Sequence, residues 1–228
     1  MSGVEASARR PRRTQAERRQ EAESRLLEAG LKLVAKKGIA GTTLAEVGEA
    51  AGFSRGIVAH HFGSKAAFVQ ALVESIQRRF YEGQRSLAPA PAGGERLLAS
   101  AKMYLTRTGD MSAAMNAMVT EAIIYGGELQ QALRAFTSVA AGYYGALVEQ
   151  AVNNREVSAE VDAEAMGFVL LSMLRGMAAT ELLLGDDPRL KRVRAAALLA
   201  IERILGYDRK GGAAVPARKA VRVKPSTS

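Results

Sequence analysis

The sequence contains no cysteine and only two histidines, which are neighbours at positions 60 and 61. The absence of cysteine excludes structural disulfides, thiolate zinc sites and a cysteine nucleophile. The adjacent histidines leave none for a separate catalytic site, and no pair of acidic residues has a defensible catalytic spacing. Adjacent residues on a helix point about 100° apart, which argues against one metal ion bound by both histidines. We therefore predict that the chain is not an enzyme and holds no cofactor or metal.

No long hydrophobic run is free of charge. The longest one, residues 165–184, contains Arg175 and Glu181, which would both be costly inside a bilayer. No apolar segment follows the N-terminal arginines, so we expect no secretory signal peptide. With 48% hydrophobic and 24% charged residues, the composition is that of a globular protein, and we expect it to work in the cytoplasm without contact to a membrane.

The net charge of +9 is concentrated at the two ends of the chain. Residues 1–20 carry a net +4 and residues 209–228 carry +6, which leaves residues 21–208 at −1. Short basic arms of this kind commonly lie along nucleic-acid phosphates or in a minor groove. The alternative is that both arms only increase solubility and have no specific partner.

Between residues 15 and 206, apolar residues recur at spacings of three and four, which predicts an all-α fold. A first helix ends at Gly38, and Thr43 with Glu46 forms a capping box for a second helix that ends near Gly52. Ser54 is the expected cap of a short third helix, and Ser64 that of a long fourth one. A linker follows at residues 88–94. Further helices are expected near residues 95–108, 111–126, 128–153, 162–184 and 188–206, with Asp162 and residues 186–187 as N-caps.

The segment 43–62 has the pattern of a helix-turn-helix. Gly48 supplies the small residue that two closely crossing helices require, and Gly52 permits positive φ in the tight turn. The apolar positions that would fix the crossing are Leu44, Val47, Ala51, Phe53, Val58 and Phe62. The residues expected to face outward, where a major groove would lie, are Ser54, Arg55, Gly56, Ile57, Ala59 and His60.

These residues resemble the TetR (tetracycline-repressor-like) family. The resemblance rests on Gly38, the Thr42-Thr43 pair, the turn 50–54 and the segment 60–65, and it covers residues 20–75 at the level of motifs. It implies a bacterial regulator that binds a palindromic double-stranded DNA operator as a homodimer, on the nucleoid, and has an inducer pocket in its C-terminal domain. The DNA-binding residues predicted in this way are Thr42, Thr43, Ser54, Arg55, Gly56, Ile57, His60, His61 and Lys65.

Within this set, the resemblance implies separate roles. Thr43, at a helix N-terminus, His61 and Lys65 resemble the family's phosphate contacts. Arg55, Gly56 and His60 occupy base-reading or groove-lining positions, with Arg55 the candidate for a guanine. The sequence departs from the family at Ala59, where a tyrosine is usual, so the operator cannot be taken from relatives. Three alternatives stay open. The helix-turn-helix segment is instead a protein-docking module, the chain compacts DNA without sequence preference, or the regulator is an activator and not a repressor.

The last two long helices offer a dimerisation surface, with small residues such as Gly167 and Gly176 beside an apolar stripe. A dimer would let two reading helices span two half-sites about one helical turn apart. The predicted interface residues are Leu170, Leu174, Met177, Val193, Ala197, Ala200 and Ile204. The alternative is that the stripe belongs to the core of a single chain.

The middle helices mix methionines with aromatic residues, a composition that suits the wall of a pocket for a small, largely apolar effector with an acidic or acyl end. The predicted lining residues are Met103, Arg107, Met111, Met115, Met118, Glu121, Tyr125, Phe136, Tyr143 and Tyr144. Core packing or ion pairs remain the alternative for each of them.

The predicted organisation is a basic flexible arm (1–19), a helix-turn-helix domain (20–66), a ligand-binding and dimerisation domain (67–207) and a basic disordered tail (208–228). Effector binding would shift the helix that begins at Lys65 and move the reading helices apart.

Overall fold

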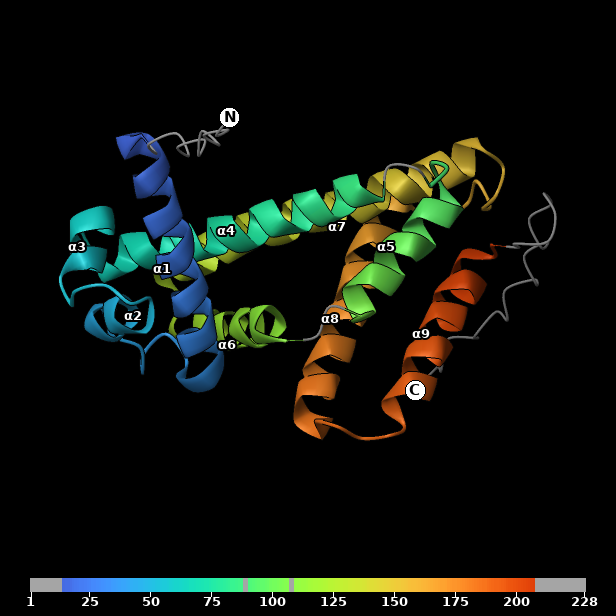
Figure 1. Ribbon diagram of the computed structural model, residues 1–228. Helices are drawn as coiled ribbons and strands as arrows, with labels where there is room; N and C mark the ends of the chain where they lie inside the picture. Colours follow the sequence, from blue (N-terminus) through green and yellow to red (C-terminus); the bar gives the residue numbers. More distant parts are fainter. Residues whose placement is uncertain (1–13, 88–89, 107–108, 208–228) are drawn as a thin grey trace, which may run out of the picture.

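The computed structural model describes residues 14–87, 90–106 and 109–207 of the 228-residue chain. Within these ranges every regular element is an α-helix, which confirms the predicted all-α fold (Figure 1). The helices are α1 (Gln15–Lys37), α2 (Leu44–Ala50), α3 (Ile57–Phe62), α4 (Lys65–Ser86), α5 (Gly94–Thr106), α6 (Asp110–Tyr125), α7 (Gly127–Asn153), α8 (Ala163–Leu184) and α9 (Leu190–Leu205). Most of the predicted N-terminal arm and the whole predicted tail lie outside the described residues.

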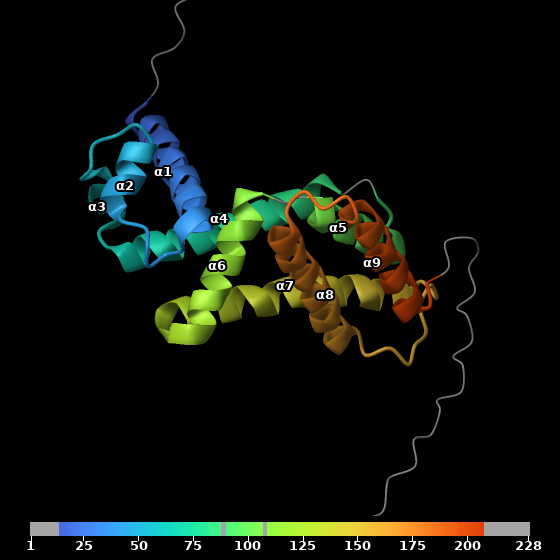
Figure 2. The ribbon, with the colours of Figure 1, turned by 90° about the horizontal axis from the view of Figure 1, so that it is seen from below.

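The helices form a small head and a larger body. The head consists of α1, α2, α3 and the start of α4, and α4 continues from it into the body formed by α5, α7, α8 and α9 (Figure 1). Helix α6 lies between the two parts in both views, and it contacts α1 on one side and α7 and α8 on the other (Figures 1 and 2). The head and the body are therefore joined by two helices, α4 and α6.

Local capping signals explain where several helices begin. The Thr43 hydroxyl accepts a hydrogen bond from the Glu46 amide, and the Glu46 carboxylate accepts one from the Thr43 amide, so the predicted capping box at α2 is confirmed. Ser64 caps α4 by accepting from the amide of Ala67, and Asp162 caps α8 in the same way. Each cap satisfies amide groups that have no partner within the helix.

Two predicted helix starts were wrong. Helix α3 begins at Ile57, and Gly56 occupies the N-cap position without a side-chain hydrogen bond. Ser54 lies in the preceding turn, where its carbonyl accepts from the Ile57 amide at 3.1 Å. Helix α9 begins at Leu190, because the Asp187 carboxylate engages the amide and the guanidinium of Arg189 ahead of the first helical turn.

The body is built on the contact between α7 and α8, where glycines bring the two backbones together. A Cβ atom at Gly145 would lie 3.0 Å from the carbonyl oxygen of Ala163, and one at Gly167 would clash with the carbonyl oxygen of Ala141. Gly167, which the sequence placed beside a dimer seam, therefore serves packing inside one chain. Gly176 has open space around it.

Helix α8 is long and apolar enough to cross a membrane by length and composition alone. In the structure one of its faces, with Leu170, Leu171 and Leu174, packs into the core. Its Glu181 is 4% exposed and accepts two hydrogen bonds from the guanidinium of Arg194 on α9, at 2.7 and 2.8 Å. The buried ion pair connects the last two helices and is unsuited to a lipid environment.

The predicted domain boundary at residues 66–67 falls inside α4, which runs without interruption from Lys65 to Ser86. No flexible segment separates head and body at this point. The division into two domains remains a prediction.

Candidate nucleic-acid interface and internal cavity

The turn between α2 and α3 depends on Gly48 and Gly52. A Cβ atom at Gly48 would lie 2.5 Å from the carbonyl oxygen of Ser54 and 3.3 Å from a methyl group of Ile57, so only glycine permits this approach of the two helices. Gly52 has φ +77°, which favours glycine. Arg25 of α1 holds the turn from behind, because it donates to the carbonyl of Ala51 at 2.7 Å and its guanidinium lies 4.6 Å from the ring centre of Phe53.

This arrangement leaves a polar face on the outside of the head. Ser54, Arg55, Gly56 and His60 are exposed, as the sequence predicted for residues that meet a DNA groove. Arg55 is paired with Glu49, which raises the pKa of the guanidinium through their hydrogen bond and charge attraction. Ala59 is exposed as well, so a methyl group occupies the position where the family usually has a tyrosine.

Two of the predicted DNA-binding residues point inward instead. Thr42 is 4% exposed, and its hydroxyl donates to the carbonyl of Gly38 at 2.7 Å, which closes the loop after α1. Ile57 is partly buried and packs against the hydrophobic core. The predicted outward position of Ile57 was wrong, because the close approach at Gly48 turns its side chain toward α2, and the buried, bonded hydroxyl of Thr42 offers no surface to DNA.

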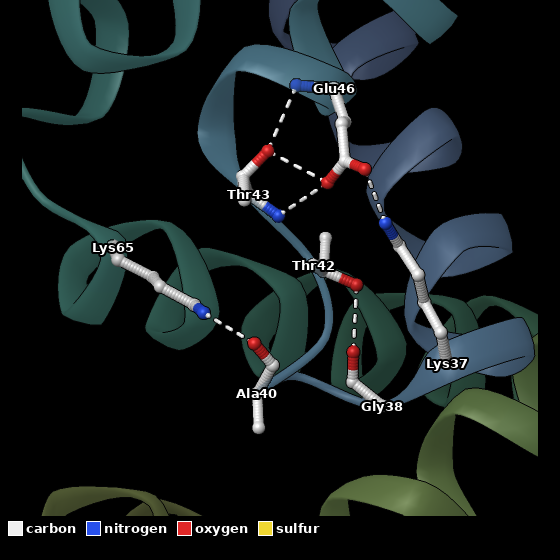
Figure 3. A network of polar contacts seen from close by, with 7 residues as sticks. All are labelled: Lys37, Gly38, Ala40, Thr42, Thr43, Glu46 and Lys65. Atoms are coloured by element: carbon white, nitrogen blue, oxygen red, sulfur yellow. Dashed lines mark hydrogen bonds and ion pairs between the residues drawn. The ribbon is translucent and has the colours of Figure 1, made fainter.

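Thr43 lies in a polar network at the start of α2 (Figure 3). Its hydroxyl donates to the Glu46 carboxylate at 2.7 Å, and Glu46 also accepts from Lys37 at 2.6 Å. These contacts, with the Lys37 hydrogen bond as the largest, lower the pKa of the Glu46 carboxyl group to about 2. The Thr43 hydroxyl is therefore already engaged, and a phosphate would have to take over one of these contacts.

Of the other two predicted phosphate contacts, Lys65 lies beside this network and His61 lies in α3. Lys65, which is exposed, donates to the carbonyl of Ala40 at 3.5 Å (Figure 3). His61 is partly buried, with its ring centre 6.2 Å from that of Phe62. The exposed ammonium group of Lys65 is free to turn toward a phosphate, whereas His61 is restricted by its neighbour.

Glu121 of α6 binds the loop that leads from α1 to α2. Its carboxylate accepts hydrogen bonds from the amides of Ile39 at 2.6 Å and Ala40 at 3.2 Å. The sequence assigned Glu121 to the pocket wall, and this was wrong. Glu121 lies 82 positions from Ile39 and 81 from Ala40 in the sequence, and no sequence pattern indicates contacts over such separations. The tight turn at Gly38, with φ +73°, brings the two amides against α6.

A partly open cavity of about 60 Å³ lies in the body between α4, α5, α6, α7 and α8. Four of the predicted lining residues surround it: Met103, Met111, Met115 and Phe136. Tyr104, an aromatic residue of the same middle helices, lines it as expected of that composition, whereas the sequence missed the remaining lining residues: Ile76, Phe80, Ser112, Ala140, Leu171 and Arg175. The open space is small beside the roughly 300–1,000 Å³ typical of ligand pockets.

The other predicted lining residues lie elsewhere. Met118 and Tyr144 are fully buried in the core, and the Tyr144 hydroxyl is 3.3 Å from that of Ser100. The ring of Tyr143 packs edge-on against Phe80, and Tyr125, at the end of α6, is 76% exposed. Arg107 lies outside the described residues. The helical spacing of apolar residues predicts which face of a helix is apolar. It does not predict which residues of distant helices each side chain contacts.

Arg175 of α8 is the one charged residue among those that line the cavity. Its guanidinium donates to the Thr137 hydroxyl at 2.8 Å and lies beside the hydroxyl of Tyr104. Burial raises the pKa of Tyr104, and the nearby Arg175 partly opposes that effect. Arg175 also lines an open cleft of about 410 Å³ that contains Arg134, Gln130 and Gln131. It therefore lies where an apolar cavity and a polar cleft meet.

The predicted dimer residues divide into two groups. Leu170 and Leu174 are each 1% exposed within a single chain, so they offer no surface to a partner, and their assignment to the interface was wrong. Met177, Val193, Ala197 and Ala200 are partly buried, and Ile204 is 48% exposed. The stripe of α8 that does reach the surface contains small and apolar residues: Ala165, Phe168, Val169, Ser172, Gly176 and Leu183.

Comparison with known proteins identifies both parts of the chain. A family model described as bacterial regulatory proteins of the tetR family matches residues 26–72, and one described as a tetracyclin repressor-like C-terminal domain matches residues 109–197. The HTH-type transcriptional regulator CymR of Pseudomonas putida is 30% identical over 206 residues, covering 87% of this chain and 98% of that protein.

Other relatives match over shorter segments or in fold. TtgR, another HTH-type transcriptional regulator of P. putida, is 45% identical over 65 residues, which cover 28% of this chain and 30% of TtgR. A TetR-family regulator from Rhodococcus sp. superposes with a TM-score of 0.72 at 21% identity, covering 82% of this chain and 99% of that one. GusR of Salmonella enterica superposes with a TM-score of 0.66 at 20% identity, over 81% and 95% of the two chains. At these identities the structural likeness bears on the fold alone.

Proposed function

Because the chain belongs to the TetR family of bacterial regulatory proteins, which are DNA-binding transcription regulators and not enzymes, we propose that it is an effector-controlled repressor. In this proposal a homodimer binds a palindromic operator in the bacterial cytoplasm and leaves it when a small, largely apolar effector binds. The observation that carries the proposal is the position of α6, which lines the cavity with Met111 and Met115 and holds the head through Glu121.

The test is selection of bound fragments from the source genome with the purified full chain, followed by footprinting at about 0.15 M salt, because affinity for DNA depends steeply on ionic strength. A short protected palindrome is the expected result. Protection without a preferred sequence would favour a nonspecific DNA-compacting protein, and no binding would overturn the assignment of the head. Reporter expression with and without the protein separates a repressor from an activator.

The exposed stripe of α8 supports the dimer. Large apolar side chains such as Phe168 and Val169 are 43% and 44% exposed, and Leu199 of α9 is 46% exposed. Small residues between them, including Ser172 and Gly176, would let a second copy approach closely. Pairing of α8 and α9 with their copies would bury this surface and place two heads on one operator.

Replacing Arg55 by alanine is expected to relax specificity at one base pair in each half-site. The exposed guanidinium can exchange Glu49 for the two acceptors of a guanine, which the alanine side chain cannot do. Binding to operators with single base-pair changes measures the effect, and we expect about a tenfold loss of discrimination at that position. The matched control is Glu49→Gln, which frees Arg55 and should preserve the site preference. An unchanged preference in Arg55→Ala would contradict the assignment.

Replacing Glu121 by alanine is expected to weaken operator binding by about tenfold, because two charge-assisted hydrogen bonds to the loop before α2 are lost. Hydrogen exchange should accelerate at the amides of Ile39 and Ala40 in the same variant. The control is Thr120→Ala on the same helix, since the Thr120 hydroxyl bonds only to the Asn116 carbonyl of α6. Equal affinity and exchange in Glu121→Ala and wild type would rule out this connection between α6 and the head.

A further inference from the structure

We propose that the effector is a mid-sized apolar carboxylic acid and that Arg175 binds its carboxylate at the edge of the cavity between α4, α5, α6, α7 and α8. The inference rests on the proposed effector-controlled function and specifies the chemistry of the ligand. The cavity wall is mainly aliphatic, thioether and aromatic, and Arg175 places a single positive charge on it.

The charge of Arg175 has only neutral partners. A guanidinium group has five N–H donors, and the contacts of this one are with the hydroxyl groups of Thr137 and Tyr104. None of the ion pairs in residues 14–87, 90–106 and 109–207 includes Arg175. Partly buried charges are normally compensated by an opposite charge. An anionic group from a ligand would supply that compensation.

The surrounding charges favour an anion as well. The other basic residue that lines the adjoining cleft is Arg134, which adds positive potential. Of the two acidic residues on the same helix, Glu181 is bound by Arg194 and Glu164 lies in the first turn, eleven residues before Arg175, while Glu121 of α6 is bound to the head. A carboxylate fits the planar guanidinium through two parallel hydrogen bonds.

The apolar wall defines the rest of the ligand. Phe80 and Phe136 present their rings to the cavity, with their ring centres 6.0 Å apart, and Met103, Met111 and Met115 supply flexible thioether side chains. The cavity of about 60 Å³ cannot hold a mid-sized acid without widening. Because Met111 and Met115 belong to α6, widening displaces the helix that binds the head. The ligand therefore binds the widened state more tightly, which is the condition for shifting a conformational equilibrium.

The experiment measures binding to the full chain without DNA, using decanoate and 2-naphthoate with their primary amides as uncharged counterparts. Calorimetric titration and the rise in thermal midpoint report affinity, because a ligand that binds only the folded state stabilises it. For the wild type we expect the acids to bind and the amides to bind at least about tenfold more weakly. In Arg175→Gln the acids should lose roughly 100-fold in affinity and their advantage over the amides.

Two further variants make the result specific. Arg134→Gln, in the open cleft, should keep the preference for acids, and Arg175→Lys should retain a reduced part of it because the charge remains without the planar fork. Operator protection by each ligand-free variant verifies that it is folded. Amides that bind the wild type as well as the acids, a preference that survives in Arg175→Gln, or no binding of either acid would overturn the proposal. Acid binding that leaves operator protection intact would instead overturn the proposed effector control and leave the binding site standing.

Discussion

Replacing Gly48 by alanine should abolish specific operator binding, with a loss of at least about 100-fold in affinity. The new methyl carbon would lie 2.5 Å from the backbone carbonyl oxygen of Ser54, so α2 and α3 must move apart. Overpacking of this kind typically costs about 1–3 kcal/mol. The more serious consequence is that the turn presenting Arg55 and His60 changes its geometry. Footprinting at fixed salt measures the loss, and circular dichroism verifies that the body retains its helices.

The control for this substitution is Gly142→Ala. Gly142 lies in α7 with open space around the position of a Cβ atom, and alanine is the better helix former by about 1 kcal/mol. This variant should keep its operator affinity and gain slightly in stability. A Gly48→Ala protein that protects the operator at wild-type concentrations would show that the close crossing of α2 and α3 is not required for recognition.

Replacing Glu181 by alanine should lower the free energy of unfolding by about 2–3 kcal/mol. Removing one partner from a buried ion pair usually costs more, but the side chain of Arg194 is 33% exposed, and water compensates part of the lost contact. For a chain of this size the thermal midpoint should fall by about 4–12 °C. Thermal unfolding at a fixed protein concentration is the appropriate measurement, because a dimer gains stability with concentration.

A surface ion pair near the same helix provides the comparison. Arg189 is paired with Asp187, and its side chain is 71% exposed. Arg189→Ala should therefore leave the thermal midpoint nearly unchanged, since exposed ion pairs contribute little to stability. Equal shifts for Glu181→Ala and Arg189→Ala would contradict the structural importance of the Glu181–Arg194 pair.

Most features that depend on neighbouring residues in the chain were predicted well from the sequence, the starts of α3 and α9 being the exceptions. The capping box of Thr43 and Glu46, the Ser64 cap and the end of α1 at Gly38 each involve groups within four residues of one another. The close approach at Gly48 also followed from the sequence, because the helix-turn-helix pattern fixes the partner a few residues away.

Features that depend on distant helices were predicted less well. Met115 and Met118 have the same chemistry and lie one turn apart, yet one lines the cavity and the other is enclosed in the core. Leu170 and Leu174 form a strong apolar stripe, and the structure places them against helices of the same chain. Arg175 was noted only as a charge within an apolar run, because the helical period does not reveal which side chains from other helices surround it.

Because α4 runs without a break from the head into the body, a tilt at one of its ends displaces the other. Phe80 lies against the cavity and Lys65 begins the same helix in the head, a separation of 15 residues or about 22 Å along the helix axis. A tilt of about 8° at the cavity would displace the other end by about 3 Å, close to the roughly 3.4 Å between successive base pairs. A sub-ångström widening at the cavity would thus be amplified along α4 into a displacement of the head by most of one base-pair step, enough to take a reading helix out of register with its half-site.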